Sequence, residues 1–160
     1  MYSIRTLFLK DCREGLRLIT LIFLFTYSLN SAQTAFNPAC GQSTIDDTFD
    51  SDTVAQAKRF LVELKGAVTD ADKKRLASMM DYPIIVAYGA GNKTVRHTVH
   101  NRSEFMTQYR SIVSLRVREA INAQSPECLF GNGQGIMIGK GEVWFRQQGD
   151  GSMKIVTINN

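Results

Sequence analysis

The sequence predicts an α+β fold in which N-terminal helices pack on a curved, mainly antiparallel β-sheet. Two patterns predict it. Apolar residues recur every third or fourth position over 54–68, which is the spacing of an amphipathic helix. Short apolar or alternating runs separated by glycine-rich turns follow, first at Ile84–Tyr88 and then between 136 and 158. A helix-rich first half and a strand-rich second half are typical of α+β domains.

The N-terminal segment has the three parts of a secretory signal peptide. Four basic residues precede an unbroken apolar run, Leu18–Leu29, and small polar residues follow it. The run has 12 residues, whereas a membrane-spanning helix needs about 20. We therefore expect residues 1–32 to be a signal peptide cleaved after Ala32. The protein would then be periplasmic or secreted, with no stable membrane span after processing. An uncleaved signal anchor is the alternative.

The remaining chain has the length of one domain. Residues 33–50 are polar and rich in turn formers, which predicts a leader, and residues 51–160 form the α+β domain. Without residues 1–32 the chain would carry 15 basic and 13 acidic residues, so its net charge would be only +2. This small excess does not predict a nucleic-acid partner.

Two of the three cysteines, Cys40 and Cys128, would remain after cleavage. An even number of cysteines in an oxidising compartment predicts a disulfide between them. Two free buried thiols are the alternative.

The first helix is expected to begin at Ser51 or Asp52, either of which can cap it, and to stop near Gly66. A second, shorter helix should start at Thr69 or Asp70 and end at Pro83.

The strands and later helices follow in turn. Asn101, with glutamate at 104, predicts a capped helix through Val113, and Ser114 should begin another short helix. Residues 131–135 are expected to be irregular. The predicted strands are Ile84–Tyr88, Thr94–His100, Ile136–Ile138, Glu142–Phe145 and, after a glycine turn, Met153–Ile158.

The segments Phe130–Phe145 and Lys154–Asn159, with Tyr82–Pro83 and Asn101–Tyr109, resemble the nuclear-transport-factor-2-like superfamily, in particular its exported bacterial members. That superfamily has a cone-shaped fold related to cystatin and includes ketosteroid isomerase. The resemblance implies a cavity between the concave sheet face and the N-terminal helices. Isomerases, binding modules and toxin-neutralising proteins share the fold, so the resemblance does not select an activity.

Sites for metals and nucleotides are not predicted. His97 and His100 are the only histidines, and residues three apart on a strand point to opposite faces. The glycines between 131 and 139 lack the spacing of a dinucleotide-binding loop. We therefore expect no metal and no cofactor.

Two carboxylates are candidates for acid–base catalysis. Asp81 lies beside Tyr82, and Glu142 lies two residues before Trp144, so an apolar surround could raise the pKa of either group. Arg96 could supply the counter-charge. We predict Tyr82, Arg96 and Trp144 as ligand-binding residues. In the structural alternative Asp81 ends a helix, Glu142 pairs with a cation, and Trp144 belongs to the core.

Three functions fit these patterns. The first is a non-catalytic binding module for a small molecule or a protein partner, which the missing catalytic set favours. The second is a ketosteroid-isomerase-like enzyme that uses Asp81 or Glu142, and the third is an interaction or immunity protein.

The strand 142–145 has large apolar residues on both faces. This pattern predicts that Trp144 is largely buried with Glu142 on the same side, and that a homodimer could cover the open sheet face. Of the two faces, we expect Glu142 and Trp144 on the cavity side.

Export gives the first testable prediction. Sequencing the N-terminus of the protein isolated from its native host should show a chain that begins at Gln33, because the signal peptidase would cut after Ala32. A chain that begins at Met1 in the cytosol would contradict export.

Overall fold

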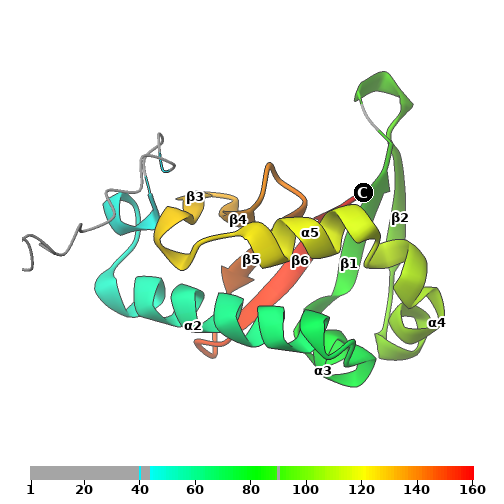
Figure 1. The fold of residues 1–160 in the computed structure, drawn as a ribbon, viewed down its shortest axis with the longest axis horizontal. Coiled ribbons are helices and arrows are strands. Elements are labelled where there is room, and N and C mark those ends of the chain that lie inside the picture. The colour runs from blue at the N-terminus through cyan, green and yellow to red at the C-terminus, as the bar shows by residue number, and fades with distance from the viewer. Residues whose placement is uncertain (1–39, 41–43, 90) are drawn as a thin grey trace, which may run out of the picture. The chain divides into compact units, whose positions relative to one another are not determined.

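Figure 1 shows a six-stranded sheet with helices packed on one face, in a computed structural model that describes residues 40, 44–89 and 91–160. The predicted α+β class is confirmed, and the expected signal peptide lies outside the described residues. The helices are η1 (Ile45–Asp47), α2 (Ser51–Thr69), α3 (Lys73–Ser78), η2 (Gly91–Lys93), α4 (Arg102–Ile112), α5 (Leu115–Ala123) and η3 (Pro126–Cys128). The strands are β1 (Met80–Tyr88), β2 (Val95–Val99), β3 (Phe130–Asn132), β4 (Gly135–Ile138), β5 (Val143–Gln147) and β6 (Met153–Asn159).

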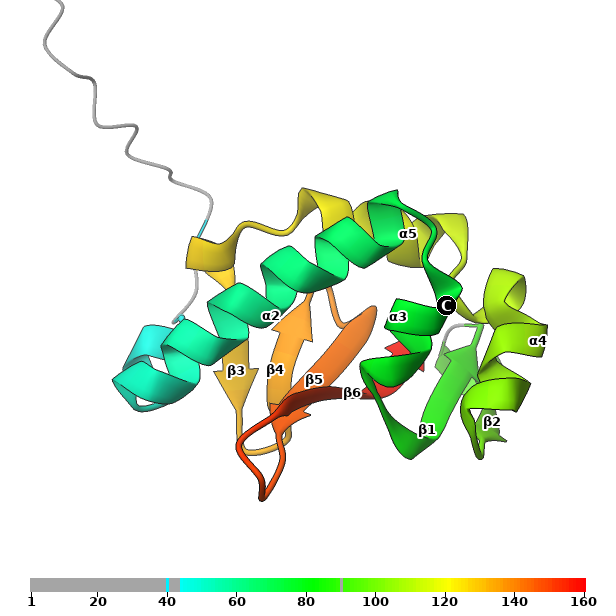
Figure 2. The same ribbon diagram turned by 90° about the horizontal axis from the view of Figure 1, so that it is seen from below.

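The sheet has the strand order β2-β1-β6-β5-β4-β3. Its pairs are antiparallel except for β1 and β6, which run parallel in the middle of the sheet. Figure 2 shows the curvature of the sheet and α2 crossing it. The strand β6 therefore joins the β1–β2 hairpin to the β3–β4–β5 meander.

Helix α2 forms where the apolar spacing predicts a helix, but both of its ends differ from the expectation. Asp50 is the N-cap, and its carboxylate accepts hydrogen bonds from the backbone N–H groups of Asp52 and Thr53. The helix also continues past Gly66 to Thr69. A glycine inside a helix costs about 1 kcal/mol, and the buried Ala67 and Val68 in the last turn offset that cost.

The second helix is shorter than predicted. It starts at Lys73, where Asp72 caps it, and stops at Ser78. Pro83 does not end it but lies inside β1, which begins at Met80 rather than Ile84. The pairing of β1 with β6 is interrupted between Met80 and Ile85, and this irregularity accommodates a residue that has no N–H to donate.

The later caps are confirmed. The side chain of Asn101 accepts from the N–H of Glu104 at 3.0 Å, and Ser114 caps α5. Glu104 reaches back to the N–H of His100 rather than to that of Asn101.

The segment expected to be irregular is instead the β3–β4 hairpin. Gly131 is required there because a Cβ at that position would collide with the ring of Phe49.

The core lies between the helices and the sheet. The rings of Phe60 from α2 and Phe145 from β5 are 4.8 Å apart, and Phe145 is fully buried. Burial of one such side chain contributes about 1.5–3 kcal/mol to stability. No helix in the described part of the chain is long and apolar enough to cross a bilayer.

The predicted disulfide joins Cys40 to Cys128. Close to this bridge, Ile45 is fully buried, and its N–H donates to the carbonyl of Leu129 at 3.0 Å. The part of the expected leader that the structure describes is thus packed against the α+β domain.

The disulfide gives the second prediction. Its cysteines are 88 residues apart, and a bridge that closes a loop of this size contributes about 4 kcal/mol in the chain-entropy model. Cys128→Ser should lower the free energy of unfolding, measured by urea titration, by an amount of this order. Cys40→Ser is the matched control and should have an equal effect, with no further loss in the double variant. Two free thiols per denatured, unreduced chain would contradict the bridge.

Candidate functional site

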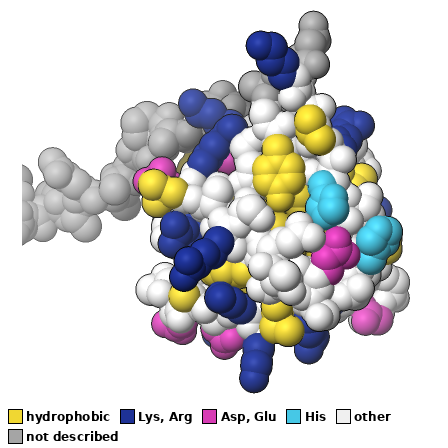
Figure 3. Space-filling model, turned by 90° about the vertical axis from the view of Figure 1, so that its right-hand side faces the viewer, with side chains coloured by type: hydrophobic (Ala, Val, Ile, Leu, Met, Phe, Trp, Pro, Cys, Tyr) yellow, Lys and Arg dark blue, Asp and Glu magenta, His cyan; other side chains and the backbone are white. Residues whose placement is uncertain are grey.

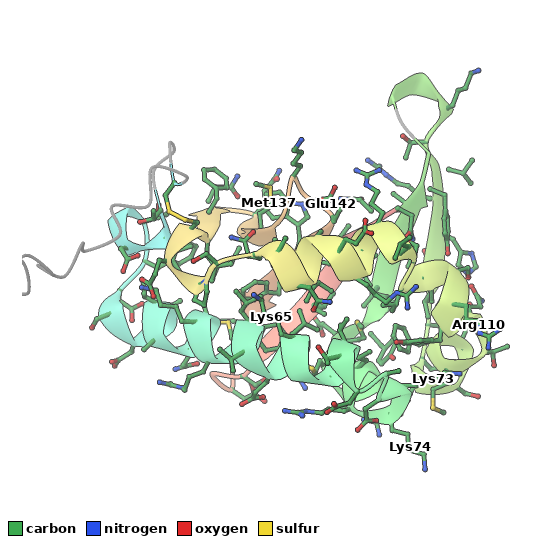
Figure 4. The ribbon with its side chains drawn as sticks, in the orientation of Figure 1. Lys65, Lys73, Lys74, Arg110, Met137 and Glu142 are labelled. Carbon is green, nitrogen blue, oxygen red and sulfur yellow. A yellow bond between two sulfur atoms is a disulfide. The ribbon has the colours of Figure 1, made fainter. Side chains whose placement is uncertain are left out.

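The face of the sheet away from the helices carries a continuous row of side chains. Directly paired residues on neighbouring strands project from the same face. The cross-strand register therefore aligns one residue from each strand, in the order Thr98, Ile85, Thr157, Trp144, Met137 and Phe130. Figure 4 labels Met137 of this row. Most of these side chains are apolar, although none of the described helices covers them.

A hollow of about 380 Å³ lies on this helix-free face. Arg96 and Trp144, two of the three predicted ligand-binding residues, both line it. The other lining residues are Ile85, Ala87, Gln134, Val156, Thr157 and Asn159. This volume is in the range of small-molecule sites.

Arg96 can act as an anion-binding group in this hollow. It lies on β2 opposite Ala87 of β1, and its side chain is exposed. The ion pairs among the described residues do not include it. Its planar guanidinium therefore keeps its donors for a carboxylate or phosphate.

Trp144 is partly buried, but the prediction that it lies on the cavity side of the sheet, towards the helices, is wrong. Its neighbours Val143 and Phe145 are fully buried on the helix side. Because successive strand residues alternate between faces, the indole lies on the helix-free face. There it provides a flat apolar surface in the hollow that Arg96 also lines, with β1 and β6 between the two residues.

Tyr82 does not join these two residues. It packs against the hydrophobic core, and its hydroxyl is buried without a hydrogen-bond partner among the described residues. Burial raises the pKa of this phenol to about 12, an effect opposed by the positive charge of Arg102.

Glu142 is buried, with 6% of its surface exposed. Arg116 of α5 donates to its Oε1 from Nε at 3.1 Å and from Nη2 at 2.9 Å. The backbone N–H of Lys140 donates to the other oxygen. Burial alone would raise the pKa of Glu142, but these hydrogen bonds outweigh it and lower the pKa.

The prediction that Glu142 shares a side with Trp144 is therefore wrong. Glu142 lies in the turn before β5, where strand alternation does not apply, and its carboxylate binds α5. The lowered pKa also differs from the raised value that a catalytic acid would need near neutral pH.

Asp81 lies on β1 and is partly buried. Its carboxylate pairs with Arg146 of β5, with 3.4 Å between Nη2 and Oδ2. The two carboxylates proposed from the sequence are therefore held by different arginines.

The histidines converge on one carboxylate. Nε2 of His97 is 3.3 Å from Oε1 of Glu104, and the backbone N–H of His100 donates to Oε2 at 2.8 Å. This N–H and the nearby imidazoles lower the pKa of Glu104, in spite of some desolvation. The described residues contain no cluster of three or more histidine, cysteine or acidic side chains that could hold a metal ion.

Several lining residues of the hollow, including Ile85, Gln134 and Asn159, were not predicted from the sequence. Alternation along β1 could have separated Ile85 from the buried Ile84 and Val86. The position of Asn159 beside Ala87 depends on the parallel pairing of β1 with β6, which no local pattern reveals.

Comparison of this chain with models of known families, with curated proteins and with solved structures gave no match. Its function must therefore be argued from the site.

The Glu142–Arg116 pair gives the third prediction. Glu142→Gln should lower the free energy of unfolding by about 2 kcal/mol at neutral pH, because it weakens charge-assisted hydrogen bonds. The folded-state pKa of Glu142 lies below the unfolded value. The ionised carboxylate therefore stabilises the fold above the unfolded pKa, and this contribution is lost as pH falls through the folded pKa. Urea titrations at several pH values should show the difference from the native chain shrinking in acid.

Glu119→Gln is the matched control, because Glu119 is exposed on α5 and belongs to no ion pair among the described residues. It should change stability by less than about 0.5 kcal/mol. A difference between Glu142→Gln and the native chain that stays constant into acid would contradict the assigned role.

Proposed function

We propose that this chain is an exported, non-catalytic binding module that holds a small anionic molecule with a flat apolar part. The observation that carries the proposal is that Arg96 and Trp144 line the same hollow on the helix-free face. A guanidinium binds a carboxylate through two parallel hydrogen bonds, and an indole stacks on a flat apolar group. A ligand with both features would use both side chains at once.

The rest of the hollow suits such a ligand. Ile85, Ala87 and Val156 contribute apolar surface, while Gln134, Thr157 and Asn159 contribute hydrogen-bonding groups. Ligand sites typically combine mostly apolar walls with a few polar groups that fix orientation. The proposed ligand is therefore an organic acid rather than an inorganic ion.

Export remains part of the proposal. The apolar run at 18–29 supports it, and the Cys40–Cys128 bridge is compatible with an oxidising compartment. The order of helices and strands supports membership of the nuclear-transport-factor-2-like superfamily, which is likewise a proposal.

An acid–base enzyme that uses Asp81 or Glu142 is less well supported. Both carboxylates are ion-paired, and the pKa of Glu142 is lowered. A general acid or base works best with a pKa near the operating pH. Arg96, which forms no ion pair among the described residues, lines the same hollow as the partly exposed indole, and this favours binding instead.

Pairing of two copies through the helix-free face is a second candidate role. The apolar row that includes Phe130, Met137 and Ile85 favours it, and Ile85 is 43% exposed. A protein partner, as in the immunity alternative, would use the same row. A small ligand would need only the hollow.

Benzoate can serve as the probe for the fourth prediction, because it is the simplest flat ring with a carboxylate. Trp144 is the only tryptophan, so its fluorescence reports on the hollow. Arg96→Met should raise the Kd for benzoate by roughly 10- to 100-fold, because it removes hydrogen bonds to a charged group worth about 1.5–3 kcal/mol. Benzamide, which has the same shape without the charge, should bind weakly to both forms.

Arg102→Met is the matched control, since Arg102 is exposed on α4 and does not line the hollow. It should leave benzoate binding unchanged. Phe130→Lys adds a charge to the apolar row two strands away from Trp144 and outside the hollow, so it should disrupt any dimer but preserve benzoate binding. Equal Kd values for native protein and Arg96→Met, or no fluorescence response to benzoate, would overturn the proposed ligand class.

A further inference from the structure

The charges of this chain are segregated along the sequence. Residues 46–72 contain seven acidic and three basic side chains, whereas residues 73–118 contain nine basic and two acidic ones. The first of these segments includes η1 and α2, and the second runs from α3 to the start of α5. Although the net charge of residues 33–160 is only +2, residues 73–118 are therefore strongly positive.

In space the positive segment gathers where α3 meets α4, at the far end of α2 from its acidic N-terminus (Figures 1 and 2). Figure 4 labels three of its cations, Lys73, Lys74 and Arg110, at this end of the molecule. We call this region the basic end and define it by five residues: Lys73, Lys74, Arg75, Arg110 and Arg118. Figure 3 views this end of the molecule and shows lysine and arginine side chains around much of its edge, with a group of them on the left and the two histidines on the right.

The cations of the basic end are not neutralised within the described part of the chain. The cations that form ion pairs among the described residues are Lys58, His97, Arg116 and Arg146, and none of these belongs to the basic end. Two acids, Asp70 and Asp72, lie in the turn before α3, and the carboxylate of Asp72 is occupied in capping that helix. The positive charge at this end is therefore available to an external anion.

The basic end also contains a hollow. It measures about 330 Å³ and is lined by Lys73 and by residues 106–111 of α4. Nζ of Lys73 lies 5.2 Å from the centre of the Tyr109 ring, and the charge of Arg118 also acts on that phenol. An ammonium and the guanidinium of Arg110 at one hollow can bind the oxygens of a phosphate group.

An exposed apolar side chain lies beside Arg118, one of these cations. Leu115 begins α5 with 62% of its surface exposed, and Arg118 follows one turn later on the same side of the helix. A cationic surface with a protruding leucine suits the boundary between lipid headgroups and acyl chains. A dissolved polyanion would leave Leu115 in water.

We propose that the basic end binds peripherally to an anionic lipid surface, with lipid phosphate groups at Lys73 and Arg110. The segregated charge orients the chain, because an anionic plane attracts the basic end and repels the acidic N-terminus of α2. This contact lies at α3 and α4, whereas Arg96 and Trp144 line the hollow on the sheet. The two proposals can therefore fail separately.

Co-sedimentation of the full chain with lipid vesicles tests this inference. One set of vesicles is phosphatidylcholine alone, and the other is equal parts phosphatidylcholine and phosphatidylglycerol. The N-terminal segment, with its apolar run and four basic residues, is identical in the native chain and in every variant, so its contribution cancels when the variants are compared with the native chain. We expect much stronger binding to the anionic set, and loss of that difference at about 0.5 M salt, where charges are screened within a few ångströms.

The charge-reversed variant Lys74→Glu/Arg110→Glu should bind anionic vesicles at least about 25-fold more weakly, which corresponds to about 1 kcal/mol for each cation lost near the surface. Arg59→Glu/Lys140→Glu is the matched control. It makes the same change in net charge with exposed cations outside the basic end, so it should lose far less binding. Circular dichroism should show that both variants are folded.

Three outcomes would overturn the proposal. The native chain could bind both vesicle types equally, or the two variants could lose binding equally. The chain could also ignore anionic vesicles but bind heparin, which would identify a soluble polyanion as the partner. A change in benzoate affinity in any of these variants would concern the sheet hollow and not the lipid contact.

Discussion

The position of β6 between β1 and β5 is the constraint on which the rest of this fold depends. Its pairing with β1 is parallel and joins segments that are far apart in the chain, whereas its pairing with β5 closes a hairpin. Without β6, the β1–β2 hairpin would have no hydrogen-bonded connection to the β3–β4–β5 meander. The hollow on the helix-free face depends on this arrangement, since Thr157 and Asn159 of β6 lie between Arg96 and Trp144. The hollow at the basic end depends on it as well, because β1 leads through β2 to α4.

The two faces of the sheet are both apolar, but only one is covered. On the helix side, Val143, Phe145 and Ile158 are buried with the aromatic side chain of Phe60. On the other side, Ile85 and Trp144 keep contact with solvent. Exposed apolar surface that runs across several strands commonly marks a binding surface. The helix-side face of the sheet therefore provides the stability of the fold, and the helix-free face provides the candidate binding surface. Stability and binding thus use different side chains.

Local patterns in the sequence predict much of the fold. The apolar spacing locates α2, and Asn101 and Ser114 begin α4 and α5 as capping chemistry requires. The wrongly predicted element boundaries occur where strand pairing in the tertiary fold overrides the local secondary-structure preference. Met80 is in a strand because it pairs with Ile155 of β6, whose N–H also donates to the carbonyl of Met79, although its neighbours in sequence favour a helix.

The candidate site was only partly predictable for the same reason. Arg96 and Trp144 were identified by residue type, but their meeting in one hollow depends on the strand order β2-β1-β6-β5. The orientation of Glu142 was mispredicted because the strand begins one residue later, so that its side chain is set by the turn and by Arg116. The alternation of apolar and polar residues along a strand does not fix the residue at which the strand begins.

The parallel pairing of β1 with β6 also has a consequence for the order in which the fold can be completed. The strand β6 follows every other described strand in the chain, so β1 emerges long before its inner partner does. Until then the inner edge of β1 offers unpaired N–H and C=O groups to any strand that it meets. A second copy of β6 presents the same sequence as the proper one. Crowded nascent chains could therefore exchange this strand, whereas slow delivery of isolated chains would favour closure within one molecule.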